Sequence, residues 1–330
     1  MKALQVTAPG KFTILDEPIP TPGDGQALVR VEAVTTCPQW DLHLRHNDPM
    51  FVGHTFHYPY TPGQPGHEAT GEVVSIGPGV TSLSVGDRVS AWTDQGHHRL
   101  GCYAQYVILD AENAIRVPAE LEPHEVAPVE LASCVGSVFN MLRSMDVLKG
   151  RRVGISGLGP AGLIAAQMAR AEGASEVIGF DLSERRMQFA LSLGFIDAAH
   201  DPREDLGDRF PRRPARTALD TSVDCVGAKA SVEFLMDRTR DTVALFGVQR
   251  EPYVFDVRHY IGLRLCGYPG ANRPAAEYAV RLIEEGDLRL GFLSTHHLPL
   301  ERYNEGVELL EKQEAIKICF WPWKDEAMST

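Results

Sequence analysis

Two different patterns of hydrophobic and polar positions divide the chain, and they change near Pro123. Before that residue, short apolar runs are separated by glycine and proline, which is typical of short β-strands joined by tight turns. The runs are ALVRVEAV (27–34), GEVVSI (71–76), DRVSAW (87–92), YAQYVIL (103–109) and NAIRVP (113–118). The pattern predicts a compact all-β domain at the start of the chain.

From Pro123 the apolar residues recur at helical spacing, and this stretch (123–145) is expected to end near Lys149 and Gly150. Strand-like segments then alternate with amphipathic helices. The expected strands are 151–156, 176–181, 217–226, 242–248 and 263–269, and the expected helices are 162–173, 183–194 and 275–288. This alternation predicts a doubly wound α/β domain with a parallel sheet.

The chain after Leu290 and the segment 201–218 depart from this alternation. Strand-like residues return at 293–300 and 315–321, with a helix expected between them at 303–313. The segment 201–218 is rich in proline and arginine and is predicted to be a solvated loop.

Composition narrows the classes of partner. The 330 residues include 32 Lys plus Arg and 44 Asp plus Glu, a formal net charge of −12. Because this charge repels a phosphate backbone, we expect no nucleic-acid partner. No apolar run approaches the roughly 18 residues of a membrane helix, and the first residues lack the apolar core of a signal peptide. The sequence therefore predicts a cytoplasmic protein that does not associate with membranes.

A glycine-rich motif lies between the first expected strand of the α/β domain and the helix that follows. It reads GxGxxG and consists of Gly157, Leu158, Gly159, Pro160, Ala161 and Gly162. The first glycine permits a tight turn, the second a close approach to a pyrophosphate, and the third close packing of helix on strand. The helix N-terminus offers its N–H groups to the phosphates. The motif predicts a Rossmann-type dinucleotide site.

Asp181 ends the next expected strand, about 20 residues beyond the motif, where a carboxylate accepts hydrogen bonds from ribose hydroxyls. An acid at this place repels a 2′-phosphate, so we expect NAD rather than NADP, although Arg185 and Arg186 lie nearby and weaken that preference. Val226 and Gly247, in the last residues of two later expected strands, are further expected cofactor contacts. The alternative is a glycine turn without cofactor, with Asp181 capping the next helix.

The segment 66–89 contains a second motif. It fits G-H-E-x-x-G-x5-G-x-x-V at each fixed position, namely Gly66, His67, Glu68, Gly71, Gly77 and Val80. This resembles the zinc-containing alcohol dehydrogenases of the medium-chain dehydrogenase/reductase superfamily, over nearly the whole chain. The resemblance implies a GroES-like β domain that carries zinc and a Rossmann domain, with the C-terminal segment belonging to the first. We therefore expect 1–122 with 290–330 as one domain and 123–289 as the other.

The resemblance also implies a catalytic zinc, which holds an alcohol oxygen and lowers its pKa while a hydride passes to a nicotinamide. The matching ligands are Cys37, His67 and Glu130, with Glu68 either a direct ligand or a neighbour of the ligands. Glu130 is similar to a glutamate of the polyol-dehydrogenase branch. Cys134 is the alternative third ligand.

The stretch CPQWDLH (37–43) departs from the family pattern by one extra residue between Cys37 and Asp41. Cys37 is therefore either a zinc ligand or a packed core thiol. Gln39 occupies the place where the family often has a proton-relaying hydroxyl. His43 becomes the candidate for proton relay or ribose contact, and Asp41 the candidate for orienting His67. Together with Glu68, these two are the expected catalytic residues.

The family's structural zinc lobe requires four closely spaced cysteines, whereas the corresponding segment 90–105 contains only Cys102. We therefore expect one zinc per chain. The expected function is an NAD-linked dehydrogenase that acts on a secondary alcohol or polyol, or reduces the carbonyl product, and that forms a dimer or tetramer as the family commonly does. The alternatives are a zinc-free quinone or enoyl reductase of the same superfamily and a non-catalytic nucleotide-binding relative.

Overall fold

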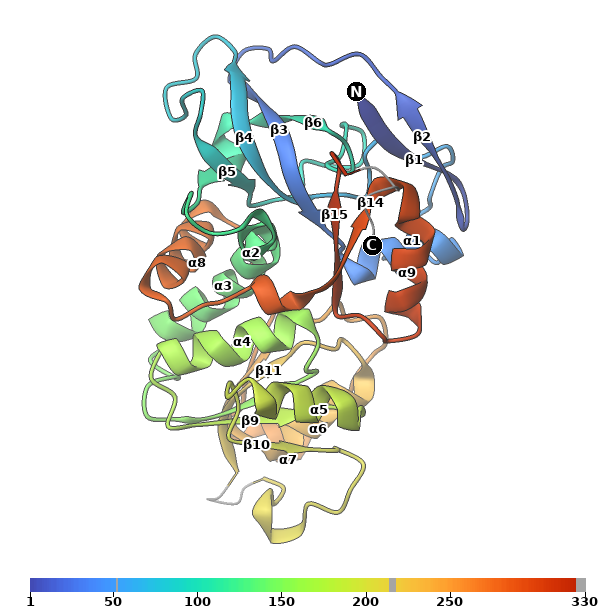
Figure 1. Cartoon of the computed structure of the whole chain (residues 1–330). Coiled ribbons are helices and arrows are strands. Elements are labelled where there is room, and N and C mark those ends of the chain that lie inside the picture. The colour runs from blue at the N-terminus through green and yellow to red at the C-terminus, as the bar shows by residue number, and fades with distance from the viewer. Residues whose placement is uncertain (52, 214–217, 325–330) are drawn as a thin grey trace. The chain divides into compact units, whose positions relative to one another are not determined.

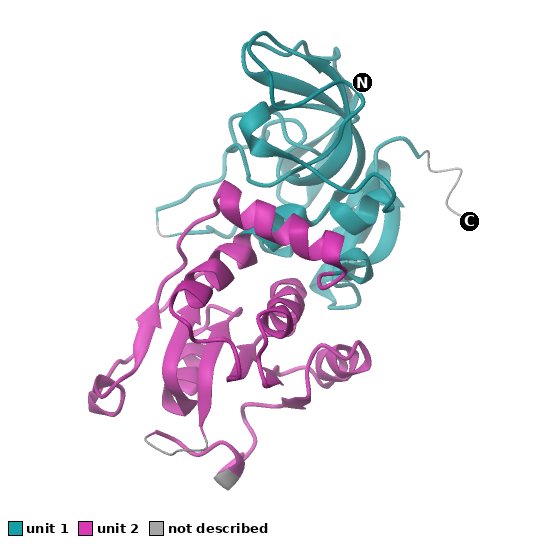
Figure 2. Cartoon of the chain, turned by 90° about the vertical axis from the view of Figure 1, so that its left-hand side faces the viewer, with its two compact units in different colours: residues 1–133, 289–330 teal, residues 134–288 magenta. Residues whose placement is uncertain are grey.

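The computed structural model describes residues 1–51, 53–213 and 218–324, so parts of the predicted loop 201–218, strand 217–226 and terminal segment 290–330 lie outside the described residues. The chain forms two compact units (Figure 2). The first unit contains residues 1–133 and 289–330, and the second contains 134–288. The chain passes from the first unit to the second after residue 133, inside a continuous helix, whereas the sequence predicted a boundary after residue 122. It returns to the first unit after residue 288, next to the predicted boundary after residue 289.

The first unit is organised around β3, which pairs antiparallel with β4, β6 and β15. In the described part of the chain the strand order of this sheet is β14-β15-β3-β4-β5-β7 (Figure 1). Its strands are β3 (Gln26–Thr35), β4 (Glu68–Ile76), β5 (Arg88–Ala91), β6 (Tyr106–Asp110), β7 (Ala114–Arg116), β14 (Ser294–Pro299) and β15 (Lys317–Trp321). A separate antiparallel pair is formed by β1 (Lys2–Ala8) and β2 (Lys11–Asp16). The C-terminal strands thus complete a sheet begun by the N-terminal ones.

The second unit is a parallel sheet in the order β10-β9-β8-β11-β12-β13. Its strands are β8 (Arg152–Ser156), β9 (Glu176–Phe180), β10 (Ala198–His200), β11 (Leu219–Asp224), β12 (Thr239–Leu245) and β13 (Arg264–Cys266). The order reverses between β8 and β11, which is the point where doubly wound sheets bind their ligands at the carboxyl ends of the strands. The predicted fold class, a GroES-like β domain with a Rossmann domain, is confirmed.

Helices cover both sheets. They are α1 (Pro38–His46), α2 (Pro123–Val126), α3 (Val129–Ser144), α4 (Pro160–Ala171), α5 (Glu184–Ser192), α6 (Lys229–Arg238), α7 (Val257–Tyr260), α8 (Arg273–Glu285) and α9 (Tyr303–Glu311). In the second unit α4 and α5 pack on β8, β9 and β10, while α6 packs on β8, β11 and β12. Right-handed crossovers in opposite directions place these two groups on opposite faces of the sheet. No helix in the described ranges is long and apolar enough to cross a bilayer.

A buried carboxylate joins three segments of the first unit that are far apart in sequence. Asp41 in α1 accepts hydrogen bonds from the Tyr103 hydroxyl, 3.0 Å from each carboxylate oxygen, and from the Tyr303 hydroxyl at 2.8 Å. Tyr303 begins α9, which packs against α1 (Figure 1). Burial raises the pKa of Asp41 to about 6 in spite of these hydrogen bonds. Folding therefore disfavours the ionised form of the Asp41 carboxyl group.

Asp41→Asn is expected to remove part of the pH dependence of stability. Because the folded pKa of about 6 exceeds the ordinary value of 3.8, stabilisation by protonated Asp41 is complete below the ordinary value and is lost as the pH rises through 6. The shift corresponds to on the order of 3 kcal/mol. Denaturant unfolding of the metal-stripped wild type and variant, at about pH 4 and about pH 7.5, measures the change. Parallel pH profiles for the two proteins would contradict it.

Candidate active site

The pairing of β3 with β4 brings the first candidate ligands together. Thr35, near the end of β3, lies opposite Glu68, the first residue of β4. Cys37 comes two residues after Thr35 and forms the N-cap of α1, and His67 directly precedes Glu68. The Cys37 sulfur, a His67 ring nitrogen and a Glu68 oxygen all lie within 4.8 Å of one another. The extra residue in CPQWDLH therefore leaves the thiol of Cys37 next to the imidazole.

His67 is oriented by a backbone carbonyl. Its Nδ1 lies 2.7 Å from the Pro65 carbonyl oxygen, and its Nε2 lies 3.9 Å from a carboxylate oxygen of Glu130 in the first turn of α3. Burial alone would lower the pKa of His67, but Cys37 and Glu130 raise it well above its usual range. A hydrogen bond from one ring nitrogen to a carbonyl is the usual way to fix a metal-binding histidine, since it directs the other nitrogen to the metal.

Glu68 is fully buried and is bound by a lysine that the sequence analysis did not single out. Lys317 in β15 places its Nζ 2.6 Å from each oxygen of the Glu68 carboxylate, and the Thr35 hydroxyl donates to the same group at 3.1 Å. The sequence signal for Lys317 is a single charged residue in the apolar run AIKICFW (315–321). Few lysines are fully buried unless they are paired.

The donor set fits zinc. A thiolate, an imidazole nitrogen and carboxylate oxygens are the ligands that zinc takes in proteins, and a catalytic zinc keeps three of them with one open position. The structure brings Cys37, His67 and Glu68 into one group, and a Glu130 carboxylate oxygen lies 3.9 Å from the His67 Nε2. Which of Glu68, Glu130 and Cys134 would be the third zinc ligand is not tested, so the choice of Glu130 stays a prediction. Cys134 lies one turn beyond Glu130 along α3.

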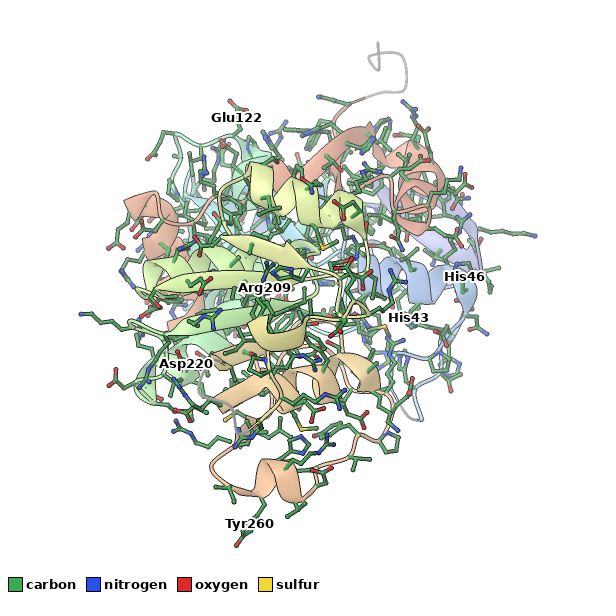
Figure 3. The ribbon with its side chains drawn as sticks, turned by 90° about the horizontal axis from the view of Figure 1, so that it is seen from below. His43, His46, Glu122, Arg209, Asp220 and Tyr260 are labelled. Carbon is green, nitrogen blue, oxygen red and sulfur yellow. The ribbon has the colours of Figure 1, made fainter. Side chains whose placement is uncertain are left out.

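The other two expected catalytic residues lie on α1, at different depths. Asp41 accepts hydrogen bonds from the hydroxyls of Tyr103 and Tyr303. The hydrogen bond that orients His67 is instead made with the Pro65 carbonyl oxygen. His43 is more accessible, and its Nδ1 lies 2.9 Å from the Asp48 carbonyl oxygen. Figure 3 labels His43 and His46 on this helix. The catalytic roles of Asp41 and His43 stay predictions.

Aromatic rings gather around Trp40, which follows Cys37 by less than one turn of α1. Its ring centroid is 4.3 Å from that of His97, 5.8 Å from His54 and 6.2 Å from Phe56. Burial is the main cause that lowers the pKa of His97, against the opposing effect of the Asp94 carboxylate. The first unit thus places a mixed aromatic and imidazole cluster in the neighbourhood of His67.

The glycine-rich motif forms the turn from β8 into α4. Gly157 has φ +86°, which L side chains rarely adopt, and a Cβ at Gly162 would lie 1.7 Å from the Gly157 carbonyl oxygen. These two glycines are therefore required by the chain itself. A Cβ at Gly159 meets nothing within 4 Å, and its φ is −77°. No contact with the described residues requires a glycine at position 159, and the open space fits the approach of a pyrophosphate.

Asp181 follows β9 and is held by the same turn. One carboxylate oxygen accepts from the Leu158 N–H at 2.8 Å and the other from the Ser183 N–H at 2.8 Å. The N-cap of α5 is Ser183, so the alternative of Asp181 as helix cap is wrong. An Arg186 guanidinium nitrogen lies 4.0 Å from the Asp181 carboxylate. The Asp181 carboxylate is thus held next to the glycine-rich turn, with the Arg186 guanidinium beside it.

Val226 and Gly247 follow β11 and β12 at the carboxyl end of the sheet. Val226 is 49% exposed, and a Cβ at Gly157 would lie 2.7 Å from its methyl group. A Cβ at Gly247 would lie 2.2 Å from the Gly227 nitrogen. Close backbone packing therefore explains the glycine at 247, whereas the exposed Val226 is an apolar surface next to the motif. Cofactor contact by either residue stays a prediction.

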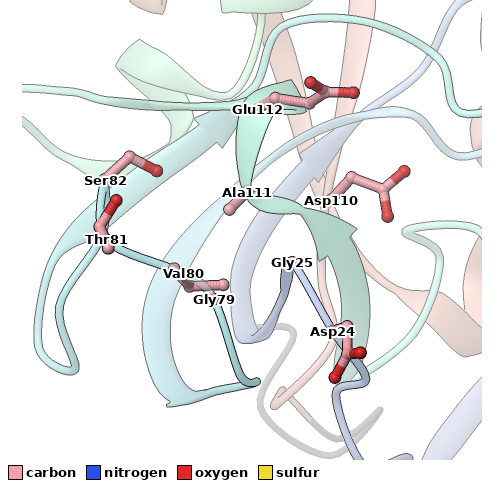
Figure 4. A pocket seen from close by; sticks show the side chains of 9 residues that line it. All are labelled: Asp24, Gly25, Gly79, Val80, Thr81, Ser82, Asp110, Ala111 and Glu112. Carbon is pink, nitrogen blue, oxygen red and sulfur yellow. The ribbon is translucent and has the colours of Figure 1, made fainter.

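A hollow of about 350 Å³ lies elsewhere in the first unit (Figure 4). It is lined by Asp24, Gly25, Gly79, Val80, Thr81, Ser82, Asp110, Ala111 and Glu112. Gly25 precedes β3 and Gly79 follows β4, so the hollow is at the opposite end of this strand pair from Cys37 and His67. It contains none of the expected ligands or catalytic residues.

Comparison with known proteins agrees with this geometry. The chain matches the family model "Alcohol dehydrogenase GroES-like domain" over residues 23–119 and the model "Zinc-binding dehydrogenase" over residues 160–285. Sorbitol dehydrogenase from Halalkalibacterium halodurans is 27% identical, covering 98% of this chain and 99% of the relative. L-threonine 3-dehydrogenase from Escherichia coli K12 is 25% identical, covering 96% and 98%.

Solved structures show the same fold. The 2R,3R-butanediol dehydrogenase of Bacillus subtilis aligns with a TM-score of 0.81 at 22% identity, covering 97% of this chain and 99% of that one. A structure from Sinorhizobium meliloti 1021 bound to NADP aligns with a TM-score of 0.81 at 24% identity, with the same coverage. The GroES-like family model matches the first unit, and the zinc-binding dehydrogenase model matches the second. The chain belongs to the zinc-type alcohol dehydrogenase family of the medium-chain dehydrogenase/reductase superfamily.

Proposed function

We propose that the protein is a zinc-dependent dehydrogenase that transfers a hydride between a secondary alcohol or polyol, or its carbonyl product, and NAD. The observation that carries the proposal is the close group of half-buried Cys37 with buried His67 and Glu68, with Glu130 beside the imidazole. A relative that only binds nucleotides, or a zinc-free quinone or enoyl reductase, has no need for such a group of metal donors.

Cys37, His67 and Glu130 would hold the zinc. When bound, zinc is a Lewis acid that lowers the pKa of the substrate hydroxyl and stabilises the alkoxide. Pro65 fixes the His67 ring for this task through its 2.7 Å hydrogen bond. We assign the transfer of the hydroxyl proton to His43, because Asp48 holds its Nδ1 and so fixes the ring for transfer at the other nitrogen.

The expected cofactor is NAD, and the support is Asp181. Its carboxylate is held in place by two backbone N–H groups, so it accepts ribose hydroxyls without reorganising. A 2′-phosphate would meet that negative charge at close range. Arg186 is the residue that works in the other direction, since a guanidinium binds phosphate well.

The expected substrate is a small molecule with several polar groups. Two relatives are named for sorbitol and threonine, which carry a hydroxyl next to another polar group. In this chain the cluster around Trp40 includes the imidazoles of His54 and His97. Imidazoles donate and accept hydrogen bonds, so such a cluster suits a hydroxylated substrate better than a long alkyl chain.

We also propose that the chain forms homodimers, as a unit of its own or within a tetramer. The support is an apolar surface on the segment 254–261, where Val257 is 79%, Tyr260 79% and Ile261 77% exposed. Tyr260 projects from α7 at the periphery in Figure 3. The segment leads into β13, the last strand of the sheet in the described residues. A twofold-related copy would cover the apolar side chains and pair the exposed edge with its own equivalent.

The purified protein is expected to contain one zinc per chain and to reduce NAD with vicinal diols or polyols at higher kcat/KM than with simple primary alkanols. Elemental analysis and a spectrophotometric substrate screen measure both. A protein with two tightly held zinc ions, or one that prefers every alkanol tested, would contradict the proposal.

The matched pair for this experiment is His67→Ala and His98→Ala. The first variant should lose the zinc and nearly all turnover, because it removes a ligand. The second removes an exposed histidine of the loop after β5 and should keep both. Circular dichroism checks that the two variants are folded. Full turnover by His67→Ala would move the protein to the zinc-free branch of the superfamily.

Asp181→Asn is expected to shift the cofactor preference toward NADP. Loss of the charge removes the repulsion of a 2′-phosphate and weakens the acceptor for ribose hydroxyls, an effect of about 1–3 kcal/mol, or roughly 5- to 150-fold in the kcat/KM ratio. Arg186→Ala should change the ratio in the opposite direction. If both variants kept the wild-type ratio of kcat/KM for NAD and NADP, these residues would not determine the cofactor preference.

The double variant Tyr260→Asp with Ile261→Asp is expected to sediment as a monomer, whereas the wild type sediments as a dimer or a multiple of it. Charges placed on both copies of an apolar interface oppose its burial. The control is Val85→Asp, which adds a charge at a residue of the first unit that is 61% exposed. A monomeric wild type, or an unchanged mass in the double variant, would exclude this interface.

A further inference from the structure

Two buried polar atoms on neighbouring rings of the first unit have no hydrogen-bond partner among the described residues. They are the hydroxyl oxygen of Tyr60 and the Nδ1 of His97, and the centroids of the two rings are 5.9 Å apart. A buried polar group without a partner destabilises the folded protein, so native proteins contain few of them. Two such atoms on rings that lie side by side indicate a ligand group that binds to both.

The surroundings of the two rings determine what they can bind. Burial and then the Asp94 carboxylate raise the pKa of Tyr60, so its hydroxyl keeps its proton and can donate. Burial lowers the pKa of His97 in spite of Asp94, so the imidazole is neutral at pH 7 and one of its nitrogens accepts. The pair therefore offers one donor and one acceptor. A ligand hydroxyl uses both, whereas a carbonyl only accepts and an ammonium only donates.

The segment 60–67 positions this pair together with His67. The Thr61 hydroxyl donates to the His97 carbonyl oxygen at 2.6 Å, and the Gln64 amide donates to two other carbonyls of the loop after β5 at 3.3 Å and 3.1 Å. A backbone carbonyl of the same segment orients the His67 ring. The loop that carries His97 is thus attached to the segment that presents a candidate metal ligand.

Trp40 connects the pair to the other candidate ligand. Its ring centroid is 4.3 Å from that of His97, and it lies in the first turn of α1, whose N-cap is Cys37. The imidazole of His97 is only partly buried, so a molecule in the solvent can reach the ring. The donor and the acceptor are therefore placed beside the candidate metal donors, within the same unit.

We propose that Tyr60 and His97 form a specificity site that binds a second hydroxyl of the substrate, next to the hydroxyl that reacts. The Tyr60 hydroxyl donates to the oxygen of this group, and the Nδ1 of His97 accepts from it. Because both atoms are shielded from solvent, the partly exposed ring of His97 tilts to admit the group. The inference rests on the alcohol dehydrogenase activity of the proposed function, and it narrows the substrate to a diol or polyol rather than an amino alcohol.

The test uses Tyr60→Phe and His97→Phe, which keep an aromatic ring and remove the polar atoms. The matched control is Tyr58→Phe, because the Tyr58 hydroxyl already donates to the Leu44 carbonyl oxygen at 2.6 Å. Three probes share one carbon skeleton: the vicinal diol of butane, sec-butanol, and the amino alcohol in which an amine replaces one hydroxyl of that diol. The measurements are kcat/KM with NAD for each probe, and melting temperature with and without the diol in the presence of NADH.

Tyr60→Phe and His97→Phe are each expected to lose about 10- to 100-fold in kcat/KM for the diol and to keep the wild-type value for sec-butanol, which has no second hydroxyl. The diol should raise the melting temperature of the wild type more than that of either variant. Without the diol, Tyr60→Phe should melt no lower than the wild type, because it removes an unpartnered hydroxyl. Tyr58→Phe should melt lower and keep the wild-type ratio of kcat/KM for the diol and sec-butanol.

Two results would overturn the inference. An unchanged ratio of kcat/KM for the diol and sec-butanol in either folded variant would show that the pair does not bind the second hydroxyl. A wild type that prefers the amino alcohol to the diol would show that the Asp94 carboxylate selects a cation instead. In both cases a wild type with one zinc per chain and turnover of alcohols leaves the proposed function intact. A wild type that holds no zinc and reduces no NAD with any of the three probes would overturn both.

Discussion

The register between β3 and β4 is the constraint on which the chemistry of the first unit depends. Because Thr35 lies opposite Glu68, the thiol that follows one strand meets the imidazole that precedes the other. A shift of one residue would turn Glu68 and its neighbours to the other face of the sheet. β15 then adds Lys317 from the side of β3, next to the carboxylate that this register has buried. The pairing of β3 with β4 thus brings the candidate metal donors together, and the pairing of β15 with β3 adds the ammonium beside Glu68.

The parts of the fold that the sequence predicted are those with a strong local signal. Except for the short β10, which was not predicted, the strands of both sheets stand out as apolar runs. The glycines at 157 and 162 are explained by a positive φ and by contact with a carbonyl. The helix α1 was not predicted, since only Asp41 and Leu44 in it are buried and no apolar stripe forms. The helix α6 was not predicted either, although the helical spacing of Val232, Leu235 and Met236 is a signal for it.

The candidate site divides in the same way. Cys37, His67 and Glu68 were found because they belong to short motifs, and the turn around Asp181 because strand, glycines and helix follow in order. The sequence analysis did not find the hydroxyls that bind Asp41 or the ammonium that binds Glu68. Tyr103, Tyr303 and Lys317 are remote in sequence from the carboxylates they contact. Such contacts are created by tertiary packing, and a single sequence contains no period or spacing that reports them.

The divided path of the chain has a consequence for the order of events during synthesis on the ribosome. The second unit is one continuous stretch, 134–288, and all its strands exist before the first unit is complete. The first unit, although it begins earlier, lacks β14 and β15 until residues 294–321 have been synthesised. Until then β3 has an open edge and Glu68 has no ammonium partner. The second unit is therefore free to fold during translation, and the surroundings of the candidate metal site are completed last.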